Sequence, residues 1–290
     1  MRGAPEFRIG CAMQLSQPTR KTIAGAGAAW LLLLPGAAVA ESLEQIARRQ
    51  APHKAIYALA TDRIRAASNL AHADGAIYYE IRETCTDWRM RQRFRLRLTR
   101  NEREAVETET DSVLVEARDG RSLTFTVVTK ADGTITDRLS GIARLSRVGG
   151  SGVVELREPE PARIPLPAGT VFPTWHYLNV VREAERGRRT IWSTIFDGSE
   201  ERGRHSGINV VVLKQSPPPG RAEGRRLHQP PGWLMRVTYF APEPGDGRPT
   251  YSFRVHMTET GIARDMLLDY GAFTMTGTLK ALEPLDRPSC

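Results

Sequence analysis

The sequence predicts an all-β fold: a mainly antiparallel sheet of roughly 12–14 strands that curls as a broken open barrel, with one amphipathic helix packed on it. Three observations support this prediction. Apolar and polar residues alternate with a period of two almost everywhere after Ala51. Turn pairs such as Asp119-Gly120 and Asp132-Gly133 separate the alternating segments. A single later segment has helical spacing instead.

The alternating segments follow one another at intervals of roughly 8 to 15 residues, which is typical of antiparallel meanders. The proline-rich stretches 158–167 and 216–231 are predicted to be surface loops, and residues 41–49 could form a short helix. In chain order, the predicted strands are 55–64, 75–83, 88–99, 102–116, 122–130, 135–147, 153–157, 189–196, 208–215, 233–240, 250–258, 263–270 and 273–282.

The helix is predicted over residues 174–186. Pro173 and Thr174 mark its start, and Gly187 is a natural residue to follow its end. Apolar side chains recur within it at three-residue steps, and a stripe of this kind usually packs on a sheet. The stripe consists of Trp175, Leu178, Val181 and Ala184.

The first forty residues have the pattern of a secretory signal peptide. Arg20 and Lys21 precede an apolar run over 23–34, and Ala38-Val39-Ala40 offers a small-residue cleavage site. We therefore expect cleavage after Ala40, leaving residues 41–290 as a single domain outside the cytoplasm with no stable transmembrane span. The alternative is an uncleaved anchor, although the apolar run is shorter than the ~20 residues that a membrane span needs. The start codon could be Met1 or Met13.

Removal of this leader takes Cys11 with it and leaves Cys85 and Cys290. Two cysteines in an oxidising compartment suggest one disulfide, with two free thiols or intermolecular pairing as the alternatives. Neither cysteine lies in a CxxC motif, and the histidines have no ligand spacing, so we expect no metal and no other cofactor. The histidines are at positions 53, 72, 176, 205, 228 and 256.

The segment 88–98 places apolar residues on one face of a strand and arginines on the other. The arginines could form a docking surface for an anionic partner, or a solvated face paired with acidic residues of the next strand. The sequence favours the solvated face, because Glu102, Glu104, Glu107 and Glu109 follow directly. We call this set the arginine strip: Arg89, Arg91, Arg93, Arg95 and Arg97.

Catalytic motifs are weak. The glycine-rich segments 149–152 and 203–207 do not meet the GxSxG spacing of a serine nucleophile. An envelope hydrolase remains a minor alternative, which predicts loss of activity on replacement of His176 or Asp197. There is no phosphate-binding loop before a helix and no basic-aromatic signature of nucleic-acid binding.

Several segments together resemble the EipB-like cell envelope integrity family, a periplasmic group of Gram-negative alphaproteobacteria. The run Leu-Pro-Ala-Gly-Thr-Val-Phe-Pro-Thr-Trp-His over 166–176 is the most specific of them. The others are 51–55 with Tyr57, then Gly75, Tyr78 and Tyr79 leading to Cys85 and Trp88, then 196–199 and Cys290. The resemblance implies a β-spiral that holds one helix, a disulfide between Cys85 and Cys290, and no established catalytic residues.

The resemblance also implies a periplasmic role in maintaining the envelope under stress. The partner would be a lipid, a lipoprotein or a periplasmic protein, for example a tetratricopeptide-repeat protein. A curled sheet with a helix across it could enclose an apolar pocket for an acyl chain; the alternative is a protein-interaction scaffold without a ligand pocket. The candidate pocket residues are Phe94, Trp175, His176, Leu178 and Val181.

Overall fold

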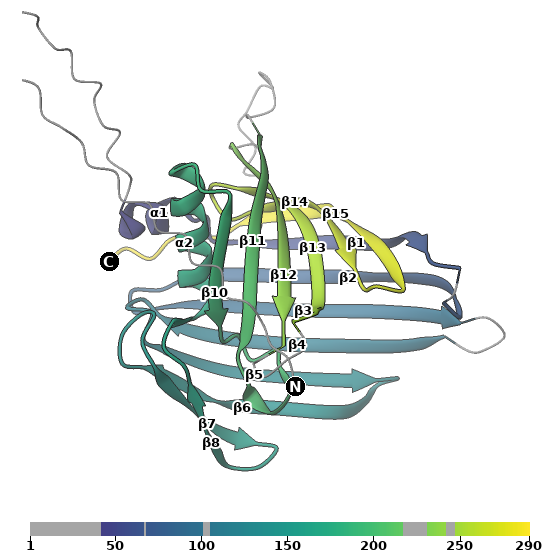
Figure 1. Ribbon diagram of the computed structural model, residues 1–290, viewed down its shortest axis with the longest axis horizontal. Coiled ribbons are helices and arrows are strands. Elements are labelled where there is room, and N and C mark those ends of the chain that lie inside the picture. Colours follow the sequence, from purple (N-terminus) through teal and green to yellow (C-terminus); the bar gives the residue numbers. More distant parts are fainter. Residues whose placement is uncertain (1–41, 67, 101–104, 217–230, 242–246) are drawn as a thin grey trace, which may run out of the picture. The chain divides into compact units, whose positions relative to one another are not determined.

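One 15-stranded sheet and two α-helices make up the described part of the computed structural model (Figure 1). The structure describes residues 42–66, 68–100, 105–216, 231–241 and 247–290. The predicted signal peptide over 1–40 and residues 217–230 of the arginine- and proline-rich stretch therefore lie outside the described residues. Neither helix among the described residues is long and apolar enough to cross a membrane.

The strands follow one another closely in the chain, and a short 3-10 helix, Glu201–Gly203, lies between the tenth and the eleventh. The first eight are β1 (His53–Ile64), β2 (Leu70–Glu83), β3 (Asp87–Arg100), β4 (Val106–Ala117), β5 (Ser122–Ala131), β6 (Thr134–Leu145), β7 (Gly152–Glu158) and β8 (Ala162–Leu166). The others are β9 (Thr170–Val171), β10 (Thr190–Ile195), β11 (Ser206–Ser216), β12 (Gly232–Phe240), β13 (Pro249–Thr258), β14 (Ala263–Asp269) and β15 (Phe273–Pro284).

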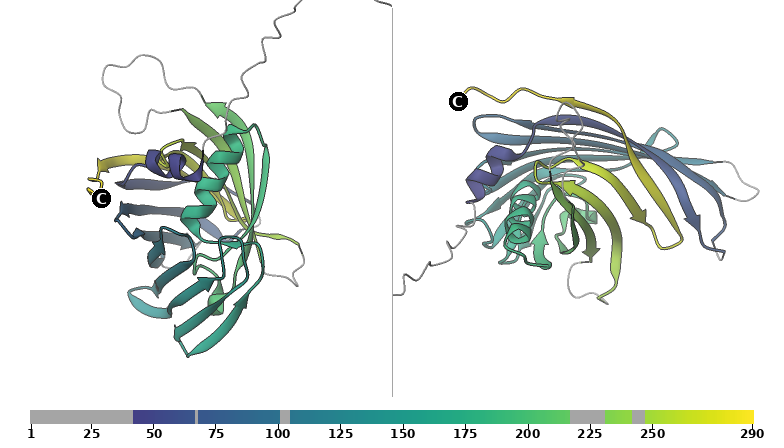
Figure 2. Two further views of the ribbon diagram at one scale, coloured as in Figure 1. Left: turned by 90° about the vertical axis from the view of Figure 1, so that its left-hand side faces the viewer. Right: turned by 90° about the horizontal axis from the view of Figure 1, so that it is seen from above.

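The sheet is built outward from β1, which pairs with β2 on one side and with β15 on the other. Strands β8 and β9 occupy its two ends, although only residues 167–169 separate them in the chain. All neighbours are antiparallel except β9 and β10. The sheet curls into a nearly closed, barrel-like form around α2 (Figure 2). The predicted all-β, mainly antiparallel fold class is confirmed.

The period-two pattern of the sequence accounts for the two faces of each strand. In β3, Trp88, Met90 and Leu96 are buried while the intervening arginines are exposed. The tight curl also needs small residues where backbones approach closely. At Gly75 a Cβ atom would come within 2.2 Å of the carbonyl oxygen of Arg95 on the neighbouring strand.

Both helices begin and end at residues with clear physical roles. Helix α1 (Leu43–Arg49) starts at a capping box formed by Ser42 and Gln45. Helix α2 (Pro173–Glu185) begins with Pro173 in its first turn, and Gly187 follows its end with φ of +78°. The predicted helix over 174–186 is thus confirmed to within one residue, and the short helix considered for 41–49 forms as α1.

The apolar stripe predicted for α2 is only partly correct. Leu178, Val181 and Ala184 are buried, but Trp175 is only half-buried, and its indole lies over Gly120 in the turn between β4 and β5. Because the curled sheet surrounds α2, residues outside the three-residue stripe are buried as well. These are Thr174, His176 and Val180.

Two apolar clusters fill the interior. The larger joins both helices to β2–β8 and β10–β13, and within it the ring of Phe196 makes edge-to-face contacts with those of Phe125 and Phe172. The smaller consists of residues of β1, β2, β3, β14 and β15 and includes Tyr57 and Phe273. The core is therefore continuous with the concave face of the sheet, and this is the face that forms the site described below.

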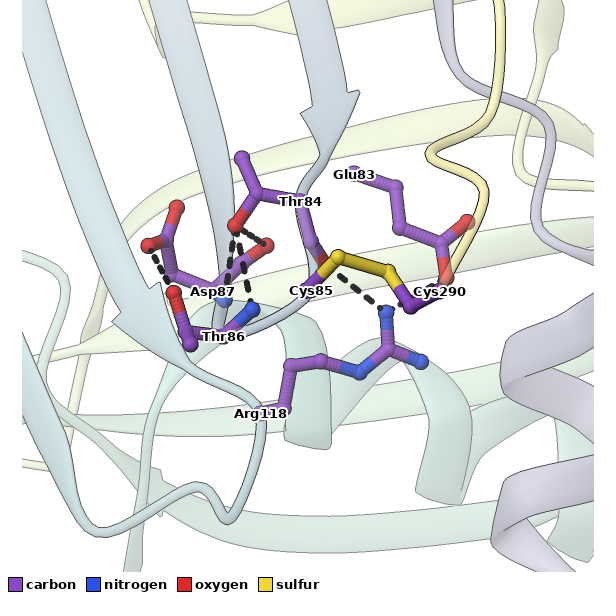
Figure 3. The surroundings of a disulfide bond; sticks show 7 residues. All are labelled: Glu83, Thr84, Cys85, Thr86, Asp87, Arg118 and Cys290. Carbon is purple, nitrogen blue, oxygen red and sulfur yellow. Dashed lines mark hydrogen bonds and ion pairs between the residues drawn. A yellow bond between two sulfur atoms is a disulfide. The ribbon is translucent and has the colours of Figure 1, made fainter.

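A disulfide joins Cys85 to Cys290, with their Cα atoms 5.8 Å apart (Figure 3). Cys85 lies in the turn between β2 and β3, where Thr84 Oγ1 accepts hydrogen bonds from the backbone amides of Thr86 and Asp87. Cys290 follows β15. The disulfide thus joins a turn at one end of β2 to the segment after β15, which is far from β2 in the sequence.

Candidate functional site

The concave side of the sheet holds a cavity of about 630 Å³ that is open to solvent. Residues of β1–β4 line one wall, residues of β12–β14 line the facing wall, and α2 and the segment after β10 complete it. This volume lies within the range of small-molecule binding sites. Much of the lining is apolar and includes Ile77, Ile81, Met90, Phe94, Leu114 and Phe253.

Four buried polar side chains line the same cavity: Gln50 after α1, His53 at the start of β1, and Thr174 and His176 in α2. The Nδ1 atom of His53 lies 2.8 Å from the carbonyl oxygen of Ala51, and its ring contacts that of Tyr79 at 5.6 Å between centroids. Burial lowers the pKa of His53 and lowers the pKa of His176 to about 4, so both rings are neutral at pH 7.

Tyrosines form a further group along the cavity. The Tyr57 hydroxyl donates to the carbonyl oxygen of Ala263 at 2.9 Å, and the Tyr177 hydroxyl donates to that of Glu259 at 3.2 Å. Burial raises the pKa of Tyr79 to about 12, so it stays a neutral phenol at physiological pH. Such side chains combine an apolar ring with a fixed polar tip. The remaining tyrosines of the cavity are Tyr239 and Tyr251.

The charged side chains that line the cavity are acidic. Asp197 Oδ1 accepts hydrogen bonds from the backbone amide of Ser199 at 2.9 Å and from its hydroxyl at 2.6 Å. Glu200 Oε1 accepts from the Ser206 hydroxyl at 2.9 Å. Within the part of the chain that the structure describes, no lysine or arginine lines the cavity. The charged groups of the cavity lining are therefore negative rather than positive.

Glu116 on β4 is fully buried and positions the start of α2. Its carboxylate accepts hydrogen bonds from the backbone amides of Thr174 at 2.7 Å and Trp175 at 3.1 Å. The N-cap residue, Phe172, has no side chain that could do this, so a strand supplies the cap. Burial raises the pKa of Glu116 to about 7 despite these bonds.

A family model described as EipB-like matches residues 44–286. The cell envelope integrity protein EipB of Brucella abortus is 32% identical over 268 residues, which cover 91% of this chain and 94% of that protein. The chain belongs to the EipB-like family. A crystal structure of a beta-barrel-like protein with a domain of unknown function, also from Brucella abortus, superposes with a TM-score of 0.74 at 31% identity. That match covers 82% of this chain and 99% of the other.

In this EipB-like fold, the five candidate pocket residues fall into two groups. Phe94 and His176 line the cavity. Leu178 and Val181 are buried in the larger apolar cluster instead, and Trp175 packs on a turn, so none of these three lines the cavity. The physical reason is that α2 presents only its first turns to the cavity, while its remaining buried residues pack against the sheet and α1.

The arginine strip lies on the outer face of β3, and carboxylates of neighbouring residues pair with most of it. The ion pairs are Arg89–Asp87 (2.8 Å), Arg91–Asp111 (2.8 Å), Arg93–Asp111 (2.7 Å) and Arg95–Glu109 (3.1 Å). Arg97 lies opposite Glu107 in the register of β3 and β4. Glu102 and Glu104 fall outside the described residues. The strip thus has the partners that the solvated-face interpretation requires.

Among the described residues, no hydrogen bond joins His176 to Asp197. His176 and Asp197 both line the cavity, but His176 Nδ1 has no hydrogen-bond partner among the described residues. A catalytic base needs an orienting group on one ring nitrogen and a nucleophile on the other. The described residues also contain no cluster of three metal-ligating side chains.

Sequence reasoning missed several residues of the site. Glu116 follows Leu114 on the inward phase of β4, and a carboxylate in an apolar phase is a signal that could have identified it. His53 was also missed, and of its two ring nitrogens only Nδ1 has a hydrogen-bond partner. Gln50 gives no comparable signal, because its burial depends on the packing of α1 against the sheet.

Proposed function

We propose that this protein is a non-enzymatic, periplasmic cell envelope integrity protein that holds an apolar ligand in the cavity of its curled sheet. The ligand would be a lipid or the acyl chain of a lipoprotein. The observation that carries the proposal is the apolar-lined cavity of about 630 Å³. The family supports the envelope role, since the relative from Brucella abortus is named for cell envelope integrity.

The arrangement of the cavity supports ligand binding over a purely structural role. Protein interiors are normally packed with few voids larger than a water molecule. Here half-buried apolar side chains such as Phe94, Phe253 and Met266 face the cavity from opposite walls. Covering their exposed surface with an acyl chain would be favourable at roughly 25 cal/mol per Å² of apolar area.

The alternative, a protein-docking scaffold that uses the arginine strip, receives less support. Most of its guanidinium groups are already paired with acidic residues of β3 and β4. An anionic partner would have to compete with those carboxylates for the same donors. A periplasmic protein partner, such as a tetratricopeptide-repeat protein, stays a prediction that a pull-down from periplasmic extract can test.

Native mass spectrometry of the periplasmic protein, followed by denaturing extraction, tests the proposal. We expect a discrete adduct of lipid size in the native spectrum. Replacing Ser112 with Trp should remove the adduct, because Ser112 lies on the inward face of β4 and its larger replacement would fill the cavity.

Val113→Trp is the matched control, because the adjacent Val113 is exposed on the outer face. This variant should keep the adduct. The proposal fails if the wild-type protein carries no adduct and captures none from added lipid, or if Ser112→Trp folds normally and retains the adduct in full.

A further inference from the structure

The four neighbouring strands β10–β13 contain neither aspartate nor glutamate (Figure 1). Ile191, Val210 and Val237 lie side by side in their register and are buried, so the residues that alternate with them point outward. The cations and aromatic residues of this outer face form what we call the β10–β13 patch: Trp192, Lys214, Arg236, Phe240 and Arg254. These strands therefore contribute only positive charge to the outer face.

Two arginines of the patch lie directly opposite each other. Arg236 on β12 pairs with Arg254 on β13 in the register, and both side chains are exposed. Neither guanidinium group forms an ion pair or a hydrogen bond with any described residue. Like charges directly opposite on neighbouring strands are destabilising, and an anionic group between them would remove that repulsion. The pair thus offers an anion both charge and hydrogen-bond donors.

Strand β14, which follows β13 in the sheet, carries the nearest carboxylates in the strand order. Asp265 Oδ2 lies 3.1 Å from His256 Nδ1, and Asp269 Oδ1 accepts a hydrogen bond from a backbone amide two residues further on. Arg254 lies opposite Leu267 rather than opposite either aspartate. The patch therefore differs from the arginine strip, in which most guanidinium groups already have carboxylate partners.

The aromatic part of the patch centres on Trp192. This side chain is 59% exposed, and its ring contacts that of Phe240 with 5.2 Å between the centroids. Gly207 on β11 leaves space for the indole, since a Cβ atom there would come within 2.9 Å of Cζ2 of Trp192. Tryptophan is enriched where proteins meet the headgroup region of a membrane, because its ring is apolar and its N–H group is polar.

We propose that the β10–β13 patch docks on the surface of an anionic phospholipid bilayer, with lipid phosphates at Arg236 and Arg254 and the Trp192 ring among the headgroups. Guanidinium groups bind phosphate oxygens through charge-assisted hydrogen bonds. Each Lys or Arg near an anionic membrane strengthens binding about fivefold. Unpaired cations beside an exposed indole favour a membrane over a partner that is only anionic.

The patch lies on the reverse side of the cavity wall. Tyr239 on β12 and Phe253 on β13 line the cavity from the inner face of the same strands. Docking through the patch would thus hold one wall of the cavity against a source of lipid. The docking surface is nevertheless separate from the cavity, and it does not depend on the ligand proposed above.

Co-sedimentation with lipid vesicles tests the proposal. The purified protein is mixed with vesicles of phosphatidylglycerol and phosphatidylcholine, or of phosphatidylcholine alone, at low and at high salt. We expect binding to the anionic vesicles that high salt weakens, and much weaker binding to phosphatidylcholine alone. The double variant Arg236→Gln, Arg254→Gln should bind the anionic vesicles about 25-fold more weakly than wild type, since it loses two cations. Trp192→Ala should weaken binding at both salt concentrations, because its contribution is not ionic.

The double variant Arg91→Gln, Arg93→Gln is the matched control. It removes the same charge from the outer face of β3, where both guanidinium groups are paired with Asp111. This variant should bind the anionic vesicles nearly as tightly as wild type. Thermal unfolding shows whether each variant folds, and Arg236→Gln alone, with an expected loss of about fivefold, replaces the double variant if that one does not.

Three results would overturn the docking surface. The first is equal binding of anionic vesicles by the two double variants, and the second is equally tight binding of wild type to phosphatidylcholine alone. The third is retention of wild type on polyglutamate beads without any binding to vesicles, which would assign the patch to an acidic protein. None of these results bears on the lipid adduct expected for the cavity, so the failure of one proposal is distinguishable from the failure of the other.

Discussion

Glu116 shows how one side chain connects two parts of the fold. It sits on β4 in an apolar environment, yet its carboxylate accepts two backbone hydrogen bonds from the first turn of α2. Desolvation disfavours the charged form more strongly than these bonds favour it, which is why the pKa of Glu116 rises from its ordinary 4.5 to about 7. The orientation of α2, and hence of His176, depends on this carboxylate.

Replacing Glu116 with Gln should change how stability depends on pH. The unfolded chain loses this proton near pH 4.5, whereas the folded protein keeps it until about pH 7. The contribution of Glu116 to stability is therefore complete below pH 4.5 and is lost as the pH rises through 7, by an amount on the order of 3 kcal/mol. The stability of Glu116→Gln relative to wild type should thus increase between pH 5 and pH 8.

Urea unfolding of both proteins at several pH values measures this difference. The comparison between the two proteins is needed because His176 acts with the opposite sign. The lowered pKa of His176, about 4 against an ordinary 6.5, makes the folded state lose stability as the pH falls below 6.5. Parallel pH profiles for Glu116→Gln and wild type would contradict the prediction.

The strand pair β3 and β4 shows that a row of like charges need not be a binding surface. Arg91 and Arg93 share Asp111, and their hydrogen bonds and charges lower the pKa of that carboxyl group. Arg95 reaches both Glu107 and Glu109. The arginines of β3 thus neutralise the carboxylates of β4 and thereby stabilise the pairing of the two strands.

Arg93→Gln should lower the free energy of unfolding by less than about 1 kcal/mol, because exposed ion pairs contribute little. Arg93→Glu should cost more, since it would place a third carboxylate beside Asp111 and Glu109. Urea unfolding at low and high salt measures both effects, and salt should reduce the penalty of the Glu variant. Equal losses in the two variants at every salt concentration would argue against this pairing.

At the level of elements, local sequence signals correctly predicted those helices and strands that depend mainly on neighbouring residues. The bounds of α2 follow from Pro173 and Gly187, and most strands follow from the alternation. Strand β8 was expected to be a loop because of its prolines. It forms at the end of the sheet, where Pro165 costs no hydrogen bond on the open side. Together with the very short β9, it brings the sheet to 15 strands rather than 12–14.

The cavity could not be predicted from the sequence in the same way. Phe94 and Phe253 are 159 positions apart in the chain, and they face the same space only because β1 joins the two halves of the sheet. Likewise, the burial of His53 depends on the curl of the whole sheet rather than on its neighbours in sequence. Alternation predicts which face of a strand is inward, but the packing of facing walls decides where space remains.

At the scale of the whole molecule, the disulfide should contribute strongly to stability. It closes a sequence separation of 205 residues, for which the chain-entropy model gives up to about 5 kcal/mol. The double variant Cys85→Ser, Cys290→Ser should therefore unfold at lower urea concentration than the oxidised wild type and at the same concentration as the reduced wild type. Coincident unfolding curves for oxidised and reduced wild type would show that the bond contributes nothing.

The order of the strands has a consequence for synthesis. A ribosome makes β1 first among the strands and β15 last, yet these two strands are partners along almost their whole length. One edge of β1 must therefore remain unpaired until nearly the entire chain has been made. Unpaired edges are sites of aggregation, and pairings so distant in sequence form slowly. We therefore expect a nascent chain of this design to need protection by chaperones until its last strand has been made.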